Sequence, residues 1–153
     1  MALRNIRKYG DEILRKKCRE VDEIDDRLLT LIEDMKETMD EADGVGLAAP
    51  QVGILKKLFI IDIGEGPLVF INPEIIETSG SQTDEEGCLS LPGELKEVTR
   101  PNYVRARALN EKGEKFEIEA EELLARAILH EYDHLNGTLF IDRVKAKAPS
   151  ENK

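Results

Sequence analysis

The chain has 153 residues and a formal net charge of −10 at pH 7; this length fits one domain over residues 1–153, and the acidic balance argues against a nucleic-acid-binding groove. The first seven residues are too poor in apolar side chains for a secretory signal, and no stretch approaches the ~18 apolar residues of a membrane span, so we expect a cytoplasmic protein without membrane contact. Two cysteines, Cys18 and Cys88, are too few and too distant for a disulfide framework.

The first elements predicted along the chain are helical. Residues 11–17 favour a short helical turn, and apolar side chains at helical spacing predict a helix over residues 25–43. Asp25 or Asp26 suits the cap of this helix, because a carboxylate there accepts hydrogen bonds from free backbone N–H groups. We therefore expect a long N-terminal helix. Its apolar positions are Leu28, Leu29, Leu31, Ile32, Met35 and Met39.

Runs rich in β-branched and aromatic residues follow in one block and predict strands. Residues 110–113, Asn-Glu-Lys-Gly, are typical of a hairpin turn between the last two of these runs. A block of strands between two long helices indicates an α+β domain rather than alternating βαβ units. The predicted strands cover residues 57–63, 67–71, 75–78, 103–109 and 115–118.

A second long helix is predicted from Glu119 to the Asn136-Gly137 pair. Acidic residues occupy its first turn, strong helix formers fill its middle, and the Asn-Gly pair is a typical stop. We expect an α+β fold with mixed or antiparallel β-sheets packed around this central helix. Residues 145–153 are polar and are expected to form a flexible tail.

Both histidines of the chain lie in one five-residue stretch, His130-Glu131-Tyr132-Asp133-His134. Residues four apart lie on the same face of a helix, so both imidazoles can bind one metal ion. Glu131 lies about 100° around the helix from His130, which suits a carboxylate that contacts water at the metal. The spacing therefore predicts a metal site at His130 and His134, with Glu131 as general base.

A third ligand is needed, because a catalytic metal site usually has three protein ligands and one open position. No histidine follows His134, and the downstream carboxylates are Asp142 and Glu151. Upstream, residues 86–90, Glu-Gly-Cys-Leu-Ser, place Cys88 in a glycine-containing segment whose backbone can approach a ligand. Cys88 is the better candidate for the third ligand, and Asp142 is the alternative.

Three motifs in this order resemble the peptide deformylase family. The family pattern is Gly-x-Gly-Leu-Ala-Ala-x-Gln, then Glu-Gly-Cys-Leu-Ser, then a His-Glu-x-x-His helix, and here the motifs span residues 44–51, 86–90 and 130–134. Each motif alone is weak, but three at compatible separations are specific. The resemblance extends from the first helix to Val144. It implies a hydrolase that removes the N-formyl group from the formylmethionine of new polypeptides and releases formate.

The resemblance also implies the roles of individual residues near the metal. The side-chain amide of Gln51 and the backbone N–H of Leu89 would stabilise the negative oxygen that develops on the formyl carbon. The set of Cys88 and two histidines accepts zinc readily, whereas the resemblance implies ferrous iron as the native ion, with zinc, nickel or cobalt as substitutes.

Substrate binding is implied for five further residues. The backbone of Gly44, Val45 and Gly46 would pair with an extended formyl-Met peptide in the manner of a strand. Val45, Leu123 and Ala127, together with His130, would line an apolar pocket for the methionine side chain.

Two departures from the family pattern are visible. Leu129 stands where many relatives have glutamine, and too few residues follow the second helix for a long C-terminal helix. The second departure argues against more than a transient contact with the ribosome, and we expect a monomer.

Other interpretations remain open from the sequence. The same helix would serve a zinc peptidase or amidase, and a degenerate fold would bind metal or formylated peptides without turnover. The intact Glu131 argues against degeneration. Glu86 and Arg100 are either a supporting pair behind the site or separate surface charges.

Overall fold

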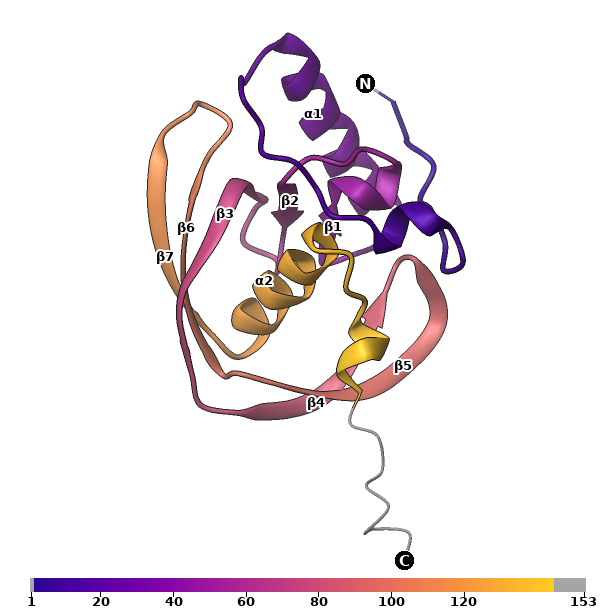
Figure 1. Cartoon of the computed structure of the whole chain (residues 1–153), viewed down its shortest axis with the longest axis vertical. Helices are drawn as coiled ribbons and strands as arrows, with labels where there is room; N and C mark the ends of the chain where they lie inside the picture. Colours follow the sequence, from indigo (N-terminus) through magenta and orange to yellow (C-terminus); the bar gives the residue numbers. More distant parts are fainter. Residues whose placement is uncertain (1, 145–153) are drawn as a thin grey trace, which may run out of the picture.

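The computed structural model describes residues 2–144 (Figure 1). Five strands form one antiparallel sheet in the order β1-β2-β3-β6-β7, and β4 and β5 form a separate antiparallel hairpin. The predicted tail, residues 145–153, lies outside the described residues. The strands are β1 (Gly46–Ala48), β2 (Leu58–Ile61), β3 (Leu68–Ser79), β4 (Gln82–Cys88), β5 (Leu91–Arg100), β6 (Tyr103–Leu109) and β7 (Lys115–Glu121).

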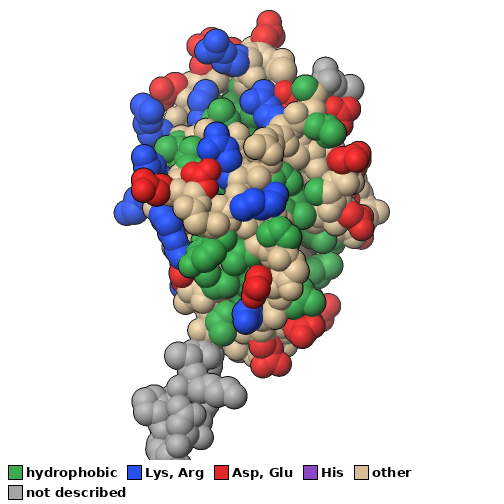
Figure 2. All heavy atoms as spheres, turned by 90° about the vertical axis from the view of Figure 1, so that its right-hand side faces the viewer, with side chains coloured by type: hydrophobic (Ala, Val, Ile, Leu, Met, Phe, Trp, Pro, Cys, Tyr) green, Lys and Arg blue, Asp and Glu red, His purple; other side chains and the backbone are tan. Residues whose placement is uncertain are grey.

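The helix that carries the two histidines lies in the middle of the fold, between the sheets, as Figure 1 shows. The predicted α+β class is confirmed, and the sheets are antiparallel. No helix within residues 2–144 is long and apolar enough to cross a membrane. The face drawn in Figure 2 mixes hydrophobic, acidic and basic side chains, and no histidine is visible on it. The helices are α1 (Asp26–Glu41) and α2 (Glu122–Leu135), with short 3-10 helices η1 (Glu12–Arg15), η2 (Ala49–Val52) and η3 (Phe140–Arg143).

Strand β2 packs against both α-helices, one on each face of the sheet. All four of its residues are buried, because the sheet is covered on both faces. Phe59 and Ile61 pack in one core with residues of α2, whereas Leu58 and Ile60 pack in a second core with residues of α1. Side chains alternate between the faces of a strand, so a continuous apolar run fits this doubly covered position.

The helix predicted over residues 25–43 is confirmed as α1, which is capped by the side chain of Asp25. The expectation that it is a long N-terminal helix is wrong, because α1 begins only at Asp26. Before it, apart from η1, the backbone bonds to distant elements; the N–H of Cys18, for example, donates to the carbonyl oxygen of Leu135 at 2.9 Å. Long-range pairing of this kind uses the backbone donors that a helix would need.

The strands also differ in part from the prediction. Residues 67–71 and 75–78 were predicted as two strands, but they belong to the single strand β3, whose register with β6 shifts between Ile71 and Glu74. Pro73 lies in this irregularity, where a missing N–H is tolerated. Strands β4 and β5 were not predicted, because their polar, largely exposed residues show no apolar alternation.

Helix α2 follows β7 without a loop. Glu122 has a φ of 57°, so this one residue turns the chain from strand to helix. The helix starts later than the predicted Glu119, because residues 119–121 complete β7. The predicted stop at Asn136-Gly137 is confirmed. Gly137 has a φ of 75°, and a Cβ there would collide with the carbonyl oxygen of Arg15.

Candidate active site

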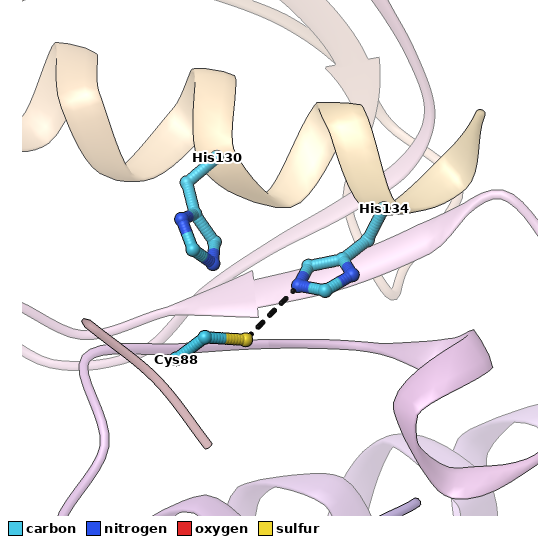
Figure 3. A group of neighbouring side chains, drawn as sticks. All are labelled: Cys88, His130 and His134. Atoms are coloured by element: carbon cyan, nitrogen blue, oxygen red, sulfur yellow. Dashed lines mark hydrogen bonds between the residues drawn. The ribbon is translucent and has the colours of Figure 1, made fainter. Parts of the chain in front are cut away.

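Helix α2 and the end of strand β4 bring three potential metal ligands together. His130 and His134 project from one face of α2 toward Cys88, the last residue of β4 (Figure 3). The Sγ atom of Cys88 lies 3.4 Å from Nε2 of His134. One ligand atom from each of the three residues lies within 4.8 Å of the others, and both imidazoles are buried.

The donor set fits a divalent ion. Metal–nitrogen and metal–sulfur bonds of about 2.0–2.3 Å in a tetrahedral arrangement separate the donor atoms by about 3.5 Å, close to the separation of Cys88 and His134. Burial alone would lower the pKa of His130, but Cys88, Glu131 and Glu86 raise it to about 10. The surroundings of this imidazole therefore favour a positive charge, which either a proton or a bound cation can supply. Burial lowers the pKa of His134, which keeps this imidazole neutral and able to bind a metal.

Asp142, the alternative third ligand, is engaged elsewhere. Its Oδ2 atom lies 2.5 Å from the guanidinium group of Arg15 and accepts a hydrogen bond from the N–H of Leu139 at 2.9 Å. Burial would raise the pKa of Asp142, but the hydrogen bonds from Arg15 and Leu139 lower it. The three ligand atoms that lie close together include that of Cys88 instead.

A buried carboxylate orients His130. Oε1 of Glu86 lies 2.8 Å from Nδ1 of His130, so Nε2 is left free to act as a metal ligand. Burial alone would raise the pKa of Glu86, but hydrogen bonds from His130 and Arg100 lower it to about 2. Glu86 therefore stays ionised at neutral pH and accepts the hydrogen bond of Nδ1.

Two arginines compensate the charge of Glu86. Arg100 donates to both carboxylate oxygens, at 2.5 and 3.0 Å, and Arg126 donates to Oε2 at 2.5 Å. Arg100 also donates to Asp133 at 3.1 Å, and Asp133 pairs with Arg143. Glu86 and Arg100 are therefore a buried pair rather than surface charges. We call Glu86, Arg100, Arg126 and Asp133, all buried, the buried ion network.

Glu131 is buried, and its carboxylate is incompletely bonded. Among the residues that the structure describes, Oε1 of Glu131 and Nδ1 of His134 are the buried side-chain atoms without a hydrogen-bond partner. Oε2 of Glu131 lies 3.9 Å from Nε2 of His130. Burial raises the pKa of Glu131 to about 7. A carboxyl group with a free oxygen and a pKa near neutrality can take up and release a proton.

A cavity of about 460 Å³ opens onto Cys88, His130 and Glu131. This volume is in the range of pockets that hold small ligands or short peptides. His134 is not part of the lining, and only 1% of its surface is exposed. All other site residues predicted from the sequence line the cavity: Gly44, Val45, Gly46, Gln51, Leu89, Leu123 and Ala127.

Gln51 is held from two sides in η2. The backbone N–H of Ala48 donates to its Oε1 at 2.9 Å, and its Nε2 donates to Oγ of Ser90 at 3.1 Å. Nε2 also lies 3.5 Å from Sγ of Cys88. Because Ala48 occupies the oxygen of the amide, the nitrogen with its two hydrogens is turned toward Cys88. Leu89 directly follows Cys88 in the turn before β5.

Two glycines permit close approach across the cavity. A Cβ on Gly46 would lie 2.5 Å from Oε2 of Glu131, and a Cβ on Gly44 would lie 2.7 Å from Cδ1 of Leu89. Gly46 begins β1, which is an edge strand paired with β2 in the described sheet. An extended peptide can therefore add to this edge directly beside Glu131.

Two residues of the site were missed by sequence reasoning, Arg126 and Ser90. Arg126 lies four residues before His130 and hence on the same face of α2, and this spacing was the available signal. Ser90 lies in the same motif as Cys88, but its contact with Gln51 joins residues 39 positions apart, which the sequence does not reveal.

Sequence comparison gives matches over nearly the whole chain. The family model described as polypeptide deformylase matches residues 3–150. The protein named peptide deformylase from Clostridium botulinum is 81% identical over 147 residues, which are 96% of this chain and all of that protein. Peptide deformylase 1 from Clostridium acetobutylicum is 70% identical over 144 residues, which are 94% of this chain and 96% of that protein.

Solved structures give the same result. Peptide deformylase from Thermotoga maritima has a TM-score of 0.92 and 46% identity, and the match covers 94% of this chain and 99% of that one. A peptide deformylase from Synechococcus elongatus, solved in complex with actinonin, has a TM-score of 0.91 and 46% identity over 97% of this chain and 81% of that one.

Proposed function

The chain belongs to the polypeptide deformylase family, and from this membership we propose how its own residues carry out the reaction. The protein is a metal-dependent hydrolase that removes the N-formyl group from the N-terminal formylmethionine of new polypeptides and releases formate. The matches give no support to the alternative of a peptidase or amidase. One observation supports the roles below: a single cavity brings together Gln51, Cys88, His130 and Glu131.

Cys88, His130 and His134 would hold the metal. A divalent ion there would polarise the formyl carbonyl group and lower the pKa of a coordinated water. Ferrous iron is proposed as the native ion, with zinc, nickel or cobalt as substitutes, because one thiolate and two imidazoles suit all four. Metal analysis of protein purified without oxygen should find iron, and iron-loaded enzyme should lose activity in air through oxidation at the thiolate. Activity that survives prolonged exposure to air would contradict iron.

Glu131 is proposed as the proton carrier. Its carboxylate would take a proton from the attacking water, for which the unpartnered Oε1 is available. The water oxygen adds to the formyl carbon, the C–N bond then breaks, and Glu131 delivers the proton to the departing amine nitrogen. The formyl carbon leaves as formate with its own oxygen and the oxygen of the water.

Gln51 and Leu89 are proposed as donors to the oxygen of the formyl group. Negative charge grows on this oxygen as water adds, and the side-chain N–H of Gln51 and the backbone N–H of Leu89 would stabilise it. Loss of one such donor costs about 3 kcal/mol, or roughly a hundredfold in kcat. Gln51→Ala should therefore lower kcat by about this factor and leave the metal in place.

The substrate peptide would add to the edge of β1 at Gly44, Val45 and Gly46. Its methionine side chain would lie against Val45, Leu123 and Ala127. Val45 and Leu123 are large apolar side chains that are 42% and 53% exposed, so a bound methionine would remove their apolar surface from water. Leu123→Ser should raise KM for formyl-Met peptides more than it lowers kcat.

The central test is formate release from formyl-Met-Ala-Ser by the wild type and by Glu131→Ala, with metal content measured on the same samples. The variant should keep its metal and lose turnover by at least about 10²-fold, the usual contribution of a general base. Glu74→Ala, at an exposed position on β3, serves as the control and should match the wild type. Equal rates for Glu131→Ala and wild type would contradict the mechanism.

The cellular setting is also proposed from the reaction. Formyl-Met nascent peptides arise at ribosomes, which supports a cytoplasmic location, and the residues proposed for the reaction all come from one chain, which supports a monomer. Light scattering on the purified protein tests the monomer. Sedimentation with ribosomes tests docking, for which we expect at most a transient contact.

A further inference from the structure

The segment Arg7–Tyr9, which we call the strap, bonds to both parts of the chain that carry the proposed oxyanion donors. The backbone N–H of Arg7 donates to the carbonyl oxygen of Gln51 at 2.7 Å, and the N–H of Tyr9 donates to the carbonyl oxygen of Ser90 at 2.8 Å. The N-terminal part of the chain runs along the right-hand side of Figure 1, which is the side turned toward the viewer in Figure 2.

The strap closes a ring of hydrogen bonds. Its two bonds reach Gln51 in η2 and Ser90 in the turn between β4 and β5, and the side chain of Gln51 donates to Oγ of Ser90 at 3.1 Å. The guanidinium group of Arg7 also lies against Gly53, which ends η2; a Cβ on Gly53 would meet it at 2.8 Å. The strap is therefore docked on η2 at two points and on the turn at a third.

The separation of the two donors is the separation of two different elements. Gln51 and Leu89 belong to different elements, η2 and the turn after β4. A donor stabilises the developing charge only within about 2.7–3.1 Å of the oxygen. A shift of about 1 Å in a reacting group can cost about a hundredfold in rate.

We propose that the strap is a positioning element of the reaction: it holds η2 against the turn after β4 and thereby sets the distance between the donors of Gln51 and Leu89. The inference rests on the roles proposed for these two residues. The strap touches neither the formyl group nor the metal ligands in this scheme, and it acts through Gln51 and Ser90.

The chain offers a substitution that breaks one bond of the ring and is compatible with the local turn: proline at residue 9 lacks the N–H, and its Cδ would point at the carbonyl oxygen of Ser90. The N–H of Asp11 donates to the carbonyl oxygen of Lys8 at 3.0 Å, and Gly10 has a φ of 104°, as in a type II turn with Tyr9 in its second position. Proline is common at that position. Tyr9→Pro therefore deletes the N–H that donates to the carbonyl oxygen of Ser90. Tyr9→Ala also removes the aromatic side chain of Tyr9 but keeps this N–H, so it is the matched control.

The expected result is a kcat for formyl-Met-Ala-Ser about tenfold lower in Tyr9→Pro than in Tyr9→Ala. Metal content should be the same in both. Affinity for the product Met-Ala-Ser should also be the same, because this peptide lacks the formyl oxygen. Equal kcat values for the two variants would overturn the inference. So would a loss of kcat in Tyr9→Pro accompanied by an equal loss of metal or of product affinity.

A second variant covers the case in which proline prevents folding. Residue 18 is a cysteine, so a synthetic segment 1–17 can be ligated to residues 18–153 to give the full chain. An ester in place of the amide between Lys8 and Tyr9 then removes the N–H without the bulk of a proline, although it also weakens the Lys8 carbonyl oxygen as the acceptor for Asp11. This protein should show the same loss of kcat, and a wild-type kcat would overturn the inference.

The variant Gln51→Ala distinguishes a failure of the strap inference from a failure of the role proposed for Gln51. In its background the difference between Tyr9→Pro and Tyr9→Ala should shrink below about threefold, because one of the two positioned donors is absent. If Gln51→Ala alone keeps the wild-type kcat, the proposed role of Gln51 fails. If Gln51→Ala loses kcat but Tyr9→Pro equals Tyr9→Ala, the strap inference alone fails.

Discussion

On the α2 side of the cavity, Glu86 receives two guanidinium groups and the imidazole of His130, whereas on the β1 side Gln51 is held by a backbone N–H and a serine hydroxyl. We call the first side, which is the buried ion network together with His130, the charged wall. We call the second side, which is Gln51 with its neutral hydrogen bonds to Ala48 and Ser90, the neutral wall. Both walls meet at Cys88, whose sulfur lies near Nε2 of His134 and Nε2 of Gln51.

The difference follows from what each wall has to hold. A metal ligand, the role proposed for His130, must keep its orientation beside a cation, and an ionised carboxylate hydrogen-bonded to it fixes that orientation strongly. Buried carboxylates require compensation, which Arg100 and Arg126 supply. A donor to the formyl oxygen needs only a correct position, for which neutral bonds suffice. Damage to the charged wall should therefore appear first in stability, and damage to the neutral wall in rate.

The largest effect is expected for Glu86→Leu. This change leaves Arg100 and Arg126 buried without their shared carboxylate, and removal of one partner of a buried ion pair costs about 3–5 kcal/mol. Urea denaturation should show this loss in the free energy of unfolding. Glu74→Leu, which breaks an exposed pair with Arg107 at 3.6 Å, should cost less than about 0.5 kcal/mol. Similar small losses for both variants would remove the distinction between the walls.

Gly46→Ala tests the point where the walls approach each other. The new Cβ would lie 2.5 Å from Oε2 of Glu131, so the carboxylate must move. We expect kcat/KM to fall by about a hundredfold, with a much smaller change in the urea midpoint. Gly87→Ala also faces the cavity, but its Cβ would meet the end of the exposed Leu95 side chain at 3.0 Å. It should lower kcat/KM only a few-fold, and equal losses would argue against a specific clash with Glu131.

Ser90→Ala weakens the neutral wall alone. It removes the hydroxyl that accepts from Nε2 of Gln51, a bond worth about 1 kcal/mol. We expect a comparable loss in the free energy of unfolding and a roughly fivefold lower kcat from a less fixed Gln51. A loss of stability as large as that of Glu86→Leu would show that the neutral wall carries as much of the fold as the charged one.

The last prediction, which changes no residue, concerns the reactivity of the two cysteines. Burial raises the pKa of Cys18 to about 11, so at pH 8 only about one molecule in a thousand carries the reactive thiolate. Iodoacetamide at pH 8 should therefore alkylate Cys88 in metal-free protein and spare Cys18 until the chain is unfolded. Bound metal should protect Cys88. Mass spectrometry of the labelled peptides measures how much of each cysteine is alkylated. Rapid labelling of Cys18 in the folded protein would contradict the burial of its side chain.

The sequence was informative where a periodic pattern and the final environment agreed. Strands β6 and β7 match runs that were predicted, because one face of each is buried in an apolar core. Strands β4 and β5 escaped prediction, because Leu91 and Val98 are the apolar residues that the hairpin buries in a core, and they are too far apart to give an alternating pattern.

The same contrast applies to the site. His130, Glu131, His134 and Cys88 lie in short motifs whose spacing reflects their chemistry. Arg126 lies on a helix face where an arginine is usually solvated, and only the fold places Glu86 against it. The strap escaped prediction because its hydrogen bonds to Gln51 and Ser90 are backbone bonds, which depend on topology and leave no trace in residue type.

The junction between β7 and α2 restricts how this protein can change in length. Glu122 alone converts strand into helix, so no loop is present to absorb an added residue. One inserted residue between Glu121 and His130 would rotate the rest of α2 by about 100° and turn both histidines away from Cys88. By contrast, the hairpin turn at residues 110–114 contributes no residue to the cavity lining and can lengthen without moving His130, His134 or Cys88. Natural variation in length among such chains should therefore collect at this turn and be rare at the junction.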